Sequence, residues 1–311
     1  MEFLKKGIYF VLFCNFFLGC SDPEISDTTL DGELIFDPSI YDPGTYLVSK
    51  SKPSPKTYEL DKPVFIACHG YSASTFEWDE FKDWANGDTS YFISQVLLGG
   101  HGRSYEDFKR ATWKDWLIPI KTEYEGLITA GYTNINFVGS STSCALITEL
   151  ISEGYFIGKL TPNNFFYIDP IVIPSNKTLS LVGVVGPMLG YAEVDNNKDE
   201  DLYWYHFRPQ ETLQELNKLI ILVRKNLEAG IKLPKESKMK VYKSIKDGSA
   251  DPVSAVLLYK GITTSGNQNI EVEMVNSELH VFTRLALREN LSNLDMANQS
   301  KCFTELISKS K

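Results

Sequence analysis

Short apolar runs alternate with amphipathic segments through the middle of this sequence. Residues 64–68 (VFIAC) and 91–98 (YFISQVLL) are rich in apolar and β-branched residues and end at glycine-containing turns, as buried strands do. Residues 114–131 instead place apolar side chains on one face of a helix. Residues 134–139 (NINFVG) predict a third strand, followed by a helix that begins near Ser143. Strands that alternate with helices predict an α/β fold, with a mostly parallel sheet covered by helices on both faces.

This alternation is interrupted at about 174–234 and resumes with an apolar strand at 238–245. Within the interruption, residues 211–227 carry leucine, isoleucine and valine at helical spacing, which predicts an amphipathic helix with an apolar partner. We interpret the interruption as a small cap that is inserted into the main domain and folds over its active site. Met188 and Tyr203 are candidates to line a substrate-binding groove beneath this cap.

The N-terminus has the pattern of an export signal. Two lysines in MEFLKK precede the apolar run GIYFVLFCNFFL, which is too short to span a bilayer as an anchor. FLGC at residues 17–20 resembles the lipobox of bacterial lipoproteins, although Phe17 and Leu18 depart from its usual residues. The resemblance implies that residues 1–19 are a signal peptide and that acylated Cys20 anchors the protein to a membrane of the bacterial cell envelope. An ordinary secretory signal and an uncleaved anchor are the alternatives.

Composition limits the classes of protein that fit. The chain has 311 residues, 43% of them hydrophobic, which suffices for one large domain at 46–311 after an acidic, turn-rich tether at 20–45. A net charge of −9 without a run of lysine or arginine argues against a nucleic-acid partner. The cysteines beyond the tether form no CxxC pair, so neither a disulfide framework nor a zinc site is expected. They are Cys68, Cys144 and Cys302.

The turns that follow the predicted strands carry a series of motifs. HGY follows the first strand, GHGRS the second and VGSST the third, and KDGSADPVSA and NSELHVF come later in that order. Over about residues 60–290 this series resembles the α/β-hydrolase family, and within it the bacterial carboxylesterases and monoacylglycerol lipases with a small cap. The resemblance implies an α/β-hydrolase fold and hydrolysis of carboxylic esters without a metal or organic cofactor. The substrate would be a small-molecule or lipid-derived ester.

In this family a G-x-S-x-G turn between a strand and a helix carries the nucleophile. The matching residues run from Gly139 to Ser143, which implies that Ser141 is the nucleophile. Ser143 stands where the motif has glycine, and its hydroxymethyl group is expected to strain the turn without abolishing it. Ser140 and Ser143 are the candidates if the register is different. A helix-capping turn without a nucleophile is the remaining interpretation.

A serine needs a base to take its proton, and the base needs a carboxylate to orient it. The chain has four histidines, and His280 comes last, where the family's order of serine, acid and histidine requires the base. The resemblance implies that Asp251, in KDGSADPV, is the acid. Asp247 in the same segment and Asp169, at the end of FFYID, are its rivals.

Acyl transfer also needs N–H groups that stabilise the oxyanion. The resemblance implies the backbone N–H groups of Tyr71, after the HG turn, and of Thr142, after the nucleophile. The sequence thus predicts a serine ester hydrolase that works through an acyl-enzyme. Two alternatives stay open, namely a thioesterase or amidase with the same triad, and a non-catalytic surface lipoprotein that uses the hydrolase scaffold for binding.

Overall fold

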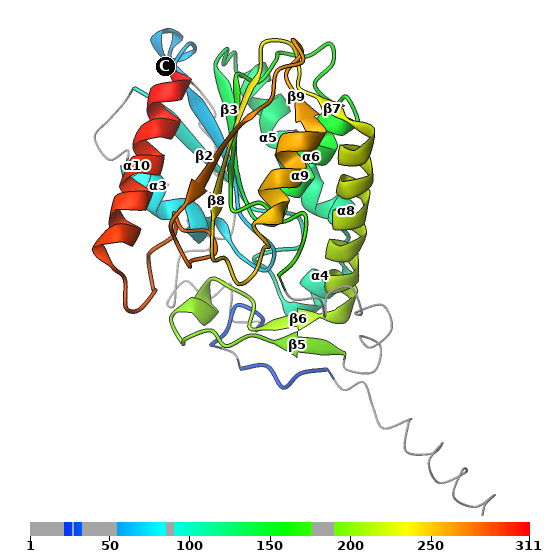
Figure 1. The fold of residues 1–311 in the computed structure, drawn as a ribbon. Helices are drawn as coiled ribbons and strands as arrows, with labels where there is room; N and C mark the ends of the chain where they lie inside the picture. Colours follow the sequence, from blue (N-terminus) through cyan, green and yellow to red (C-terminus); the bar gives the residue numbers. More distant parts are fainter. Residues whose placement is uncertain (1–21, 27, 33–54, 85–89, 176–189) are drawn as a thin grey trace, which may run out of the picture.

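A computed structural model describes residues 22–26, 28–32, 55–84, 90–175 and 190–311 of the chain (Figure 1). The predicted signal peptide, Cys20 and Met188 lie outside these residues, so the expectations about them stay predictions. In the described part of the chain, no helix is both long and apolar enough to cross a membrane.

A six-stranded sheet forms the centre of the molecule, and each neighbouring pair of its strands is parallel. In sheet order the strands are β10 (Glu271–Val275), β8 (Lys238–Ser244), β4 (Asn164–Ile168), β3 (Ile135–Ser140), β1 (Val64–Cys68) and β2 (Phe92–Val96). β1, β3 and β4 are buried along their whole length, which explains why their sequences are largely apolar and do not alternate. The sheet confirms the predicted α/β class.

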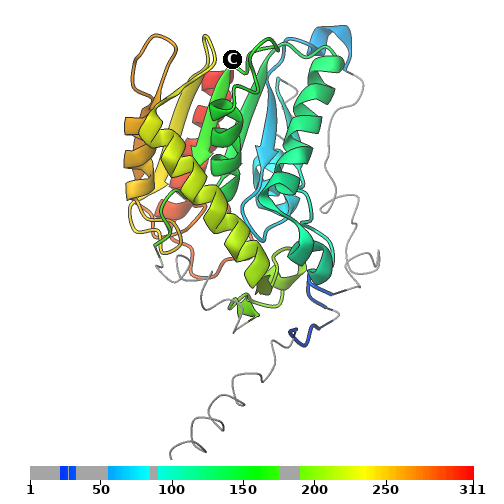
Figure 2. The same ribbon diagram turned by 90° about the vertical axis from the view of Figure 1, so that its right-hand side faces the viewer.

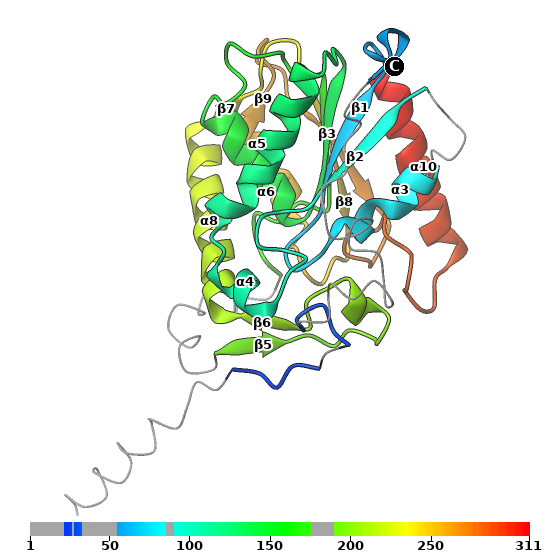
Figure 3. The same cartoon turned by 180° about the vertical axis from the view of Figure 1, so that it is seen from behind.

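Helices cover both faces of the sheet (Figures 1 and 3). One face carries α5 (Trp113–Thr129), α6 (Thr142–Ser152), α8 (Gln210–Ala229) and α9 (Val253–Gly261), which pack with the strands into the larger core. The opposite face carries α3 (Asp79–Trp84) and α10 (Asn293–Ser310) over a smaller, aromatic-rich core. The helix predicted at 114–131 is α5, and a capping box of Thr112 and Asp115 fixes its start.

A small layer crosses the carboxyl ends of the strands (Figure 1). It contains the antiparallel pair β5 (Tyr191–Glu193) and β6 (Phe207–Pro209) and the 3-10 helix η6 (Glu200–Leu202). The Tyr205 N–H donates to the Ser72 carbonyl (2.9 Å) in the loop after β1. The other short elements are η3 (Thr57–Glu59), η4 (Thr75–Trp78), α4 (Tyr105–Arg110), and the pair β7 (Ile231–Lys232) and β9 (Ile262–Thr263).

The described residues of the segment interpreted as a cap, about 174–234, fall into two parts in the structure. The layer of β5, η6 and β6 is the part that lies over the carboxyl edge of the sheet. α8 instead packs beside α6 and α9 and buries Leu219, Ile220 and Val223 in the larger core (Figure 2). The apolar stripe of α8 therefore faces the body of the domain.

Part of the segment expected to be a tether is packed against the domain. Leu30 is fully buried in a cluster with Leu97, Phe108 and Tyr205. The Asp31 carboxylate accepts hydrogen bonds from the N–H groups of His206 (2.7 Å) and Phe207 (3.2 Å), at the start of β6. Burial raises the pKa of Asp31 to about 7, although these hydrogen bonds oppose the shift. The described residues of 22–32 are thus attached to the small layer.

Candidate active site

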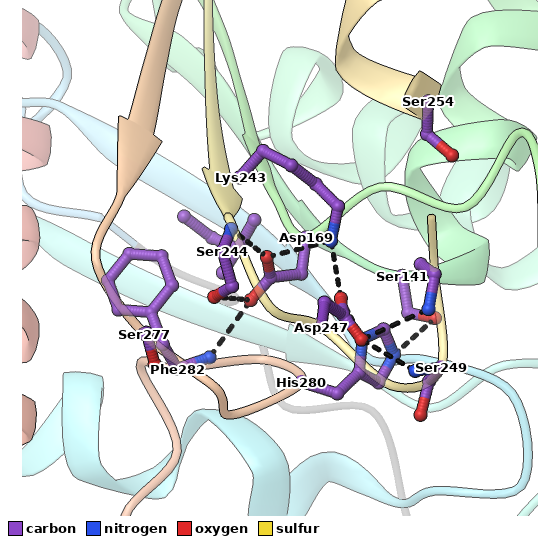
Figure 4. A network of polar contacts seen from close by, with 12 residues as sticks. Ser141, Asp169, Lys243, Ser244, Asp247, Ser249, Ser254, Ser277, His280 and Phe282 are labelled. Atoms are coloured by element: carbon purple, nitrogen blue, oxygen red, sulfur yellow. Dashed lines mark hydrogen bonds and ion pairs between the residues drawn. The ribbon is translucent and has the colours of Figure 1, made fainter. Parts of the chain in front are cut away.

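The candidate residues meet at one edge of the sheet because parallel strands have their carboxyl ends on the same side. Ser141 follows β3, Asp169 follows β4, and His280 lies in the loop after β10. Asp247 and Asp251 both lie between β8 and α9. Figure 4 shows Ser141, Asp169, Asp247 and His280 in one network of polar contacts.

The turn from β3 into α6 forces Ser141 into an unusual backbone conformation. Its φ is 50° and its ψ is −112°, in a region that favours glycine. The strand and the helix approach closely at this turn, because a Cβ on Gly139 would lie only 3.0 Å from the Ser143 Oγ and from the Ile147 Cδ1. This is the sharp strand-to-helix turn that presents a serine hydroxyl at the end of a sheet.

Ser143 occupies the position where the motif has glycine, and hydrogen bonds hold its side chain in this narrow space. The Ser143 Oγ accepts a hydrogen bond from the Ser140 N–H (2.8 Å) and lies 2.7 Å from the Cys68 carbonyl, to which it can donate. The side chain is fully buried. Ser143 therefore connects the ends of β3 and β1. The sequence predicted that its hydroxymethyl group would strain the turn, but the hydroxyl also forms hydrogen bonds there.

Ser141, His280 and Asp247 form a continuous chain of hydrogen bonds (Figure 4). The His280 Nε2 lies 2.9 Å from the Ser141 Oγ, and the His280 Nδ1 lies 2.7 Å from the Asp247 Oδ2. Because an ionised carboxylate only accepts, the Nδ1–H donates to Asp247 and leaves Nε2 free to accept the serine proton. The arrangement matches the geometry that makes a serine nucleophilic.

The structure corrects the choice of acid from Asp251 to Asp247. The Asp251 Oδ1 accepts a hydrogen bond from the Val253 N–H (2.8 Å) at the start of α9, and the Asp251 N–H donates to the Ile173 carbonyl (2.8 Å). Asp251 is therefore committed to the start of a helix. Asp247 comes four residues earlier, close to the end of β8, and reaches His280.

Every oxygen of the Asp247 carboxylate has partners in the fold. Its Oδ1 accepts from the N–H groups of Ser249 (2.7 Å) and Ala250 (3.0 Å). Its Oδ2 contacts the Lys243 ammonium as well as His280. Burial alone would raise the pKa of Asp247, but the hydrogen bond and charge of His280, together with Lys243, lower it to about 2. The carboxylate is thus ionised over the whole working range of pH.

Asp169, the other rival, has a different position. Its Oδ1 accepts from the Lys243 Nζ (3.2 Å) and the Ser244 N–H (2.7 Å). Its Oδ2 accepts from the Ser244 hydroxyl (3.1 Å) and from the Phe282 N–H (3.1 Å), two residues after His280. Asp169 therefore joins the ends of β4 and β8 to the loop that carries the histidine, and its only link to Asp247 is the shared Lys243 ammonium.

Two of the remaining histidines hold the loops around the nucleophile. The His69 Nε2 accepts from the Leu98 N–H (3.0 Å), and the His101 Nε2 accepts from the Ser72 N–H (3.3 Å). Burial lowers the pKa of His69 to about 4 and that of His101 well below its ordinary value, so both rings are neutral. They serve as structural links between the loops after β1 and β2.

His206 lies on the small layer, between carboxylates of Asp201 and Glu193, each 3.0 Å away. Burial lowers the pKa of His206, but the hydrogen bonds that its ring donates to both carboxylates, together with their charges, outweigh this effect and raise it overall. In the described part of the chain, no histidine, cysteine and carboxylate groups are arranged to hold a metal ion.

The HGY turn lies directly against the nucleophile. A Cβ on Gly70 would lie 3.2 Å from the Ser141 Cβ, so glycine allows the loop to approach. Glu77, in η4, accepts from the Gly70 N–H (2.8 Å) and from the Ser140 hydroxyl, and so fixes the loop relative to the turn. Tyr71 follows Gly70, and Thr142 is the first residue of α6. Thr142 therefore adjoins Ser141 in the chain, and Tyr71 follows the glycine that approaches Ser141 in space, while their roles as oxyanion donors stay predictions.

Two functional neighbours were not found from the sequence. Lys243 is fully buried in β8, and the sequence KMKVYKS does not distinguish it from the exposed Lys238 of the same strand. Glu77 lies in the short segment TFEW, where a glutamate would ordinarily be solvated. Tyr203, a candidate for substrate binding, stacks on Phe76 with ring centres 3.9 Å apart. Its role toward a substrate stays a prediction.

The sheet order, the sharp turn at Ser141 and the loops at the carboxyl edge define the α/β-hydrolase fold. No family model matches this sequence, and no curated protein matches it either. Solved structures do match it. A structure of the metagenome-derived lipolytic enzymes LipS and LipT superposes with a TM-score of 0.63 at 15% identity, covering 80% of this chain and 94% of the other.

Two monoacylglycerol lipases are also similar in structure. The enzyme of Saccharomyces cerevisiae, a soluble variant with a substrate analogue, gives a TM-score of 0.60 at 9% identity, covering 83% of this chain and 90% of that one. The enzyme of Paleococcus ferrophilus gives 0.57 at 12% identity, covering 80% and 97%. At such low identity the likeness establishes the fold, and the chemistry has to be inferred from the site.

Proposed function

We propose that this protein is a serine hydrolase that cleaves carboxylic esters through an acyl-enzyme on Ser141. The observation that carries the proposal is the chain of hydrogen bonds from Ser141 through His280 to Asp247, with distances of 2.9 and 2.7 Å. A serine on a strained turn, a base within reach of its proton and a buried carboxylate behind the base are the parts that acyl transfer requires.

The reaction has two steps. The Ser141 Oγ attacks the carbonyl carbon while the His280 Nε2 takes its proton, and Asp247 stabilises the imidazolium. The oxyanion is held by the N–H groups of Tyr71 and Thr142 until the C–O bond to the alcohol breaks and His280 returns the proton to the leaving oxygen. Water then repeats the sequence on the acyl-enzyme, releases the acid and regenerates Ser141.

The names of the structural neighbours support an ester as the substrate. Lipolytic enzymes and monoacylglycerol lipases share this fold, so lipid-derived and small-molecule esters are the first substrates to test. A thioesterase or amidase would use the same triad, and parallel assays of an oxygen ester, its thioester and its amide separate these activities. A non-catalytic role in binding would not explain the hydrogen bonds that join Ser141, His280 and Asp247.

The decisive test is covalent labelling of the full-length protein with a fluorophosphonate, which reacts with activated serines. We expect one adduct per chain, mapped by peptide mass to Ser141, and none in Ser141→Ala or His280→Ala. Ser143→Ala is the matched control, because it removes a neighbouring hydroxyl and should retain the adduct. A folded wild-type protein that forms no adduct would contradict the proposal and favour the binding role.

A further inference from the structure

Arg208 is a cap arginine without a partner. It occupies the middle of β6, and its Nε is buried without a hydrogen bond. Within the described residues, the side chain of Arg208 forms neither a hydrogen bond nor an ion pair, and its guanidinium lies over the ring of Tyr71. The guanidinium carbon lies 5.7 Å from the centre of that ring. The side chain is only partly exposed.

This isolation is unusual for a guanidinium. A buried N–H without a partner is costly, and the charge of a guanidinium in a protein is normally paired with a carboxylate. Burial lowers the pKa of Arg208, and Tyr71 gives only a smaller opposite effect. Arg284, a cationic neighbour of the same layer, is paired in the ordinary way: its Nη1 lies 2.7 Å from Glu200, and its guanidinium lies over Trp204.

The carboxylate closest in sequence does not neutralise Arg208. Glu211 comes three residues later, in the first turn of α8, and forms no ion pair with it. The Glu211 Oε2 is itself buried without a hydrogen bond. A positive group therefore remains uncompensated on the face of β6 that contacts Tyr71.

Arg208 is connected to the active site through Tyr71. The Tyr71 hydroxyl is hydrogen-bonded to the Thr212 Oγ1 (2.6 Å), just after β6. At the other end of Tyr71, the preceding Gly70 touches the nucleophile turn. The guanidinium of Arg208 therefore lies over the side chain of the residue whose N–H is proposed to hold the oxyanion.

We propose that Arg208 binds a carboxylate on the substrate, so that the protein prefers esters bearing a carboxylate over neutral acylglycerols. The inference rests on the proposed ester hydrolysis and specifies its substrate class. A planar carboxylate fits the guanidinium fork with two parallel hydrogen bonds and supplies the missing counter-charge. Arg208 contributes to binding and selectivity and takes no part in proton transfer.

Two matched pairs of esters test the proposal on the full-length protein. In the first pair, 4-nitrophenyl hemiglutarate carries the carboxylate on the acyl side, and its methyl ester is the neutral analogue. In the second, 4-acetoxybenzoate carries it on the alcohol side, and methyl 4-acetoxybenzoate is the neutral analogue. Rates with Ser141→Ala give the background to subtract.

We expect kcat/KM to favour the charged member of one pair by roughly 10- to 100-fold, because charged hydrogen bonds are strong. Arg208→Gln should abolish this ratio of charged to neutral rates, whereas Arg284→Gln, on the paired arginine, should retain it. A charged-to-neutral ratio that is the same in wild type and Arg208→Gln for both pairs would overturn the proposal while ester hydrolysis itself stood.

A binding measurement covers the case in which neither pair is hydrolysed. Glutarate and benzoate should raise the melting temperature of wild type and of Ser141→Ala, and should not raise that of Arg208→Gln. Stabilisation that depends on Arg208 would support the anion site even if fluorophosphonate labelling fails. Equal responses in all three proteins, or none, would overturn it.

Discussion

Two parts of the site differ in how their polar groups are paired. We call the residues around Asp247 the acid side, and the residues of β6 and the start of α8 the cap side. On the acid side, Lys243, Asp169 and Asp247 are fully or almost fully buried, and each makes several hydrogen bonds or ion pairs with the others and with backbone N–H groups. On the cap side, the Arg208 Nε and the Glu211 Oε2 are buried without partners. Lys243, Asp169 and Asp247 are thus paired without a ligand. The polar groups of the cap side become paired only when a ligand supplies the missing partners.

This difference separates two tasks. The groups that move protons must hold their geometry before the substrate arrives, so their neighbours fix them from every side. The groups that select a substrate keep unused hydrogen-bonding capacity for it, at a cost to the free protein. Substitutions on the acid side can show whether its paired groups are needed for activity.

The largest effect is expected from exchanging the acid. Asp247→Asn keeps the shape of the side chain but loses the charge that stabilises the imidazolium and can hold the wrong tautomer, so kcat should fall by about 10⁴. Asp251→Asn, the matched control in the same segment, weakens only the start of α9 and should stay within a few-fold of wild type. Turnover of a 4-nitrophenyl ester measures both. Comparable losses in the two variants would show that Asp247 is not the acid.

Lys243 and Asp169 should set the pH range of the enzyme in opposite directions. Because the pKa of Asp247 is lowered to about 2, Asp247 stays ionised across the pH range of an activity assay. The charged groups around the His280 imidazole are Asp247, Lys243, Asp169 and Arg288, whose guanidinium donates to the His280 carbonyl.

Removing the lysine charge leaves two uncompensated carboxylates near His280, and their negative charge opposes activity at low pH by stabilising the imidazolium form of the base. The acidic limb of kcat/KM should therefore move up by roughly one pH unit in Lys243→Met and down in Asp169→Asn. The double variant removes both charges and should return the limb towards wild type, and it remains informative if Lys243→Met does not fold.

The control for this series is Lys240→Met on the same strand. Lys240 pairs with Glu273 (2.8 Å) and Glu305 (2.5 Å), away from the histidine. Lys240→Met should lower the free energy of unfolding without shifting the pH profile of kcat/KM. Identical profiles in Lys243→Met, Asp169→Asn and wild type would mean that the buried lysine only fills space in the fold.

Local pattern was enough to predict the sheet and to select Ser141 and His280, which the structure places within hydrogen-bonding distance of each other. Buried parallel strands are continuous apolar runs, and the nucleophile follows such a run at a fixed place in a short motif. The acid could not be chosen in the same way. Asp247 and Asp251 lie four residues apart in one segment, and only the path of that segment in space shows that Asp251 is used by α9.

The other differences also depend on three-dimensional context. The stripe on residues 211–227 correctly predicted a helix with an apolar partner, but periodicity does not say whether that partner is the domain or the active site. Leu30 lies in an acidic, turn-rich segment whose composition suggested a tether. Lys243 is buried between the carboxylates of Asp169, after β4, and Asp247, after β8. A local sequence pattern cannot predict this contact, because it joins segments that are far apart in the chain.

The smallest effect is expected at Ser143, the departure from the glycine motif. Its hydroxyl accepts from the Ser140 N–H and reaches the Cys68 carbonyl, so removal leaves a buried donor and a buried acceptor without these partners. Ser143→Gly and Ser143→Ala should each lower the free energy of unfolding by about 1–3 kcal/mol in urea titrations. Both variants should retain kcat within a few-fold, because the Ser143 hydroxyl contacts the backbone of Ser140 and Cys68 and is not part of the chain from Ser141 to Asp247. If Ser143→Gly instead gained stability, the serine would be a strained substitute for glycine, and the connection between β1 and β3 inferred here would be wrong.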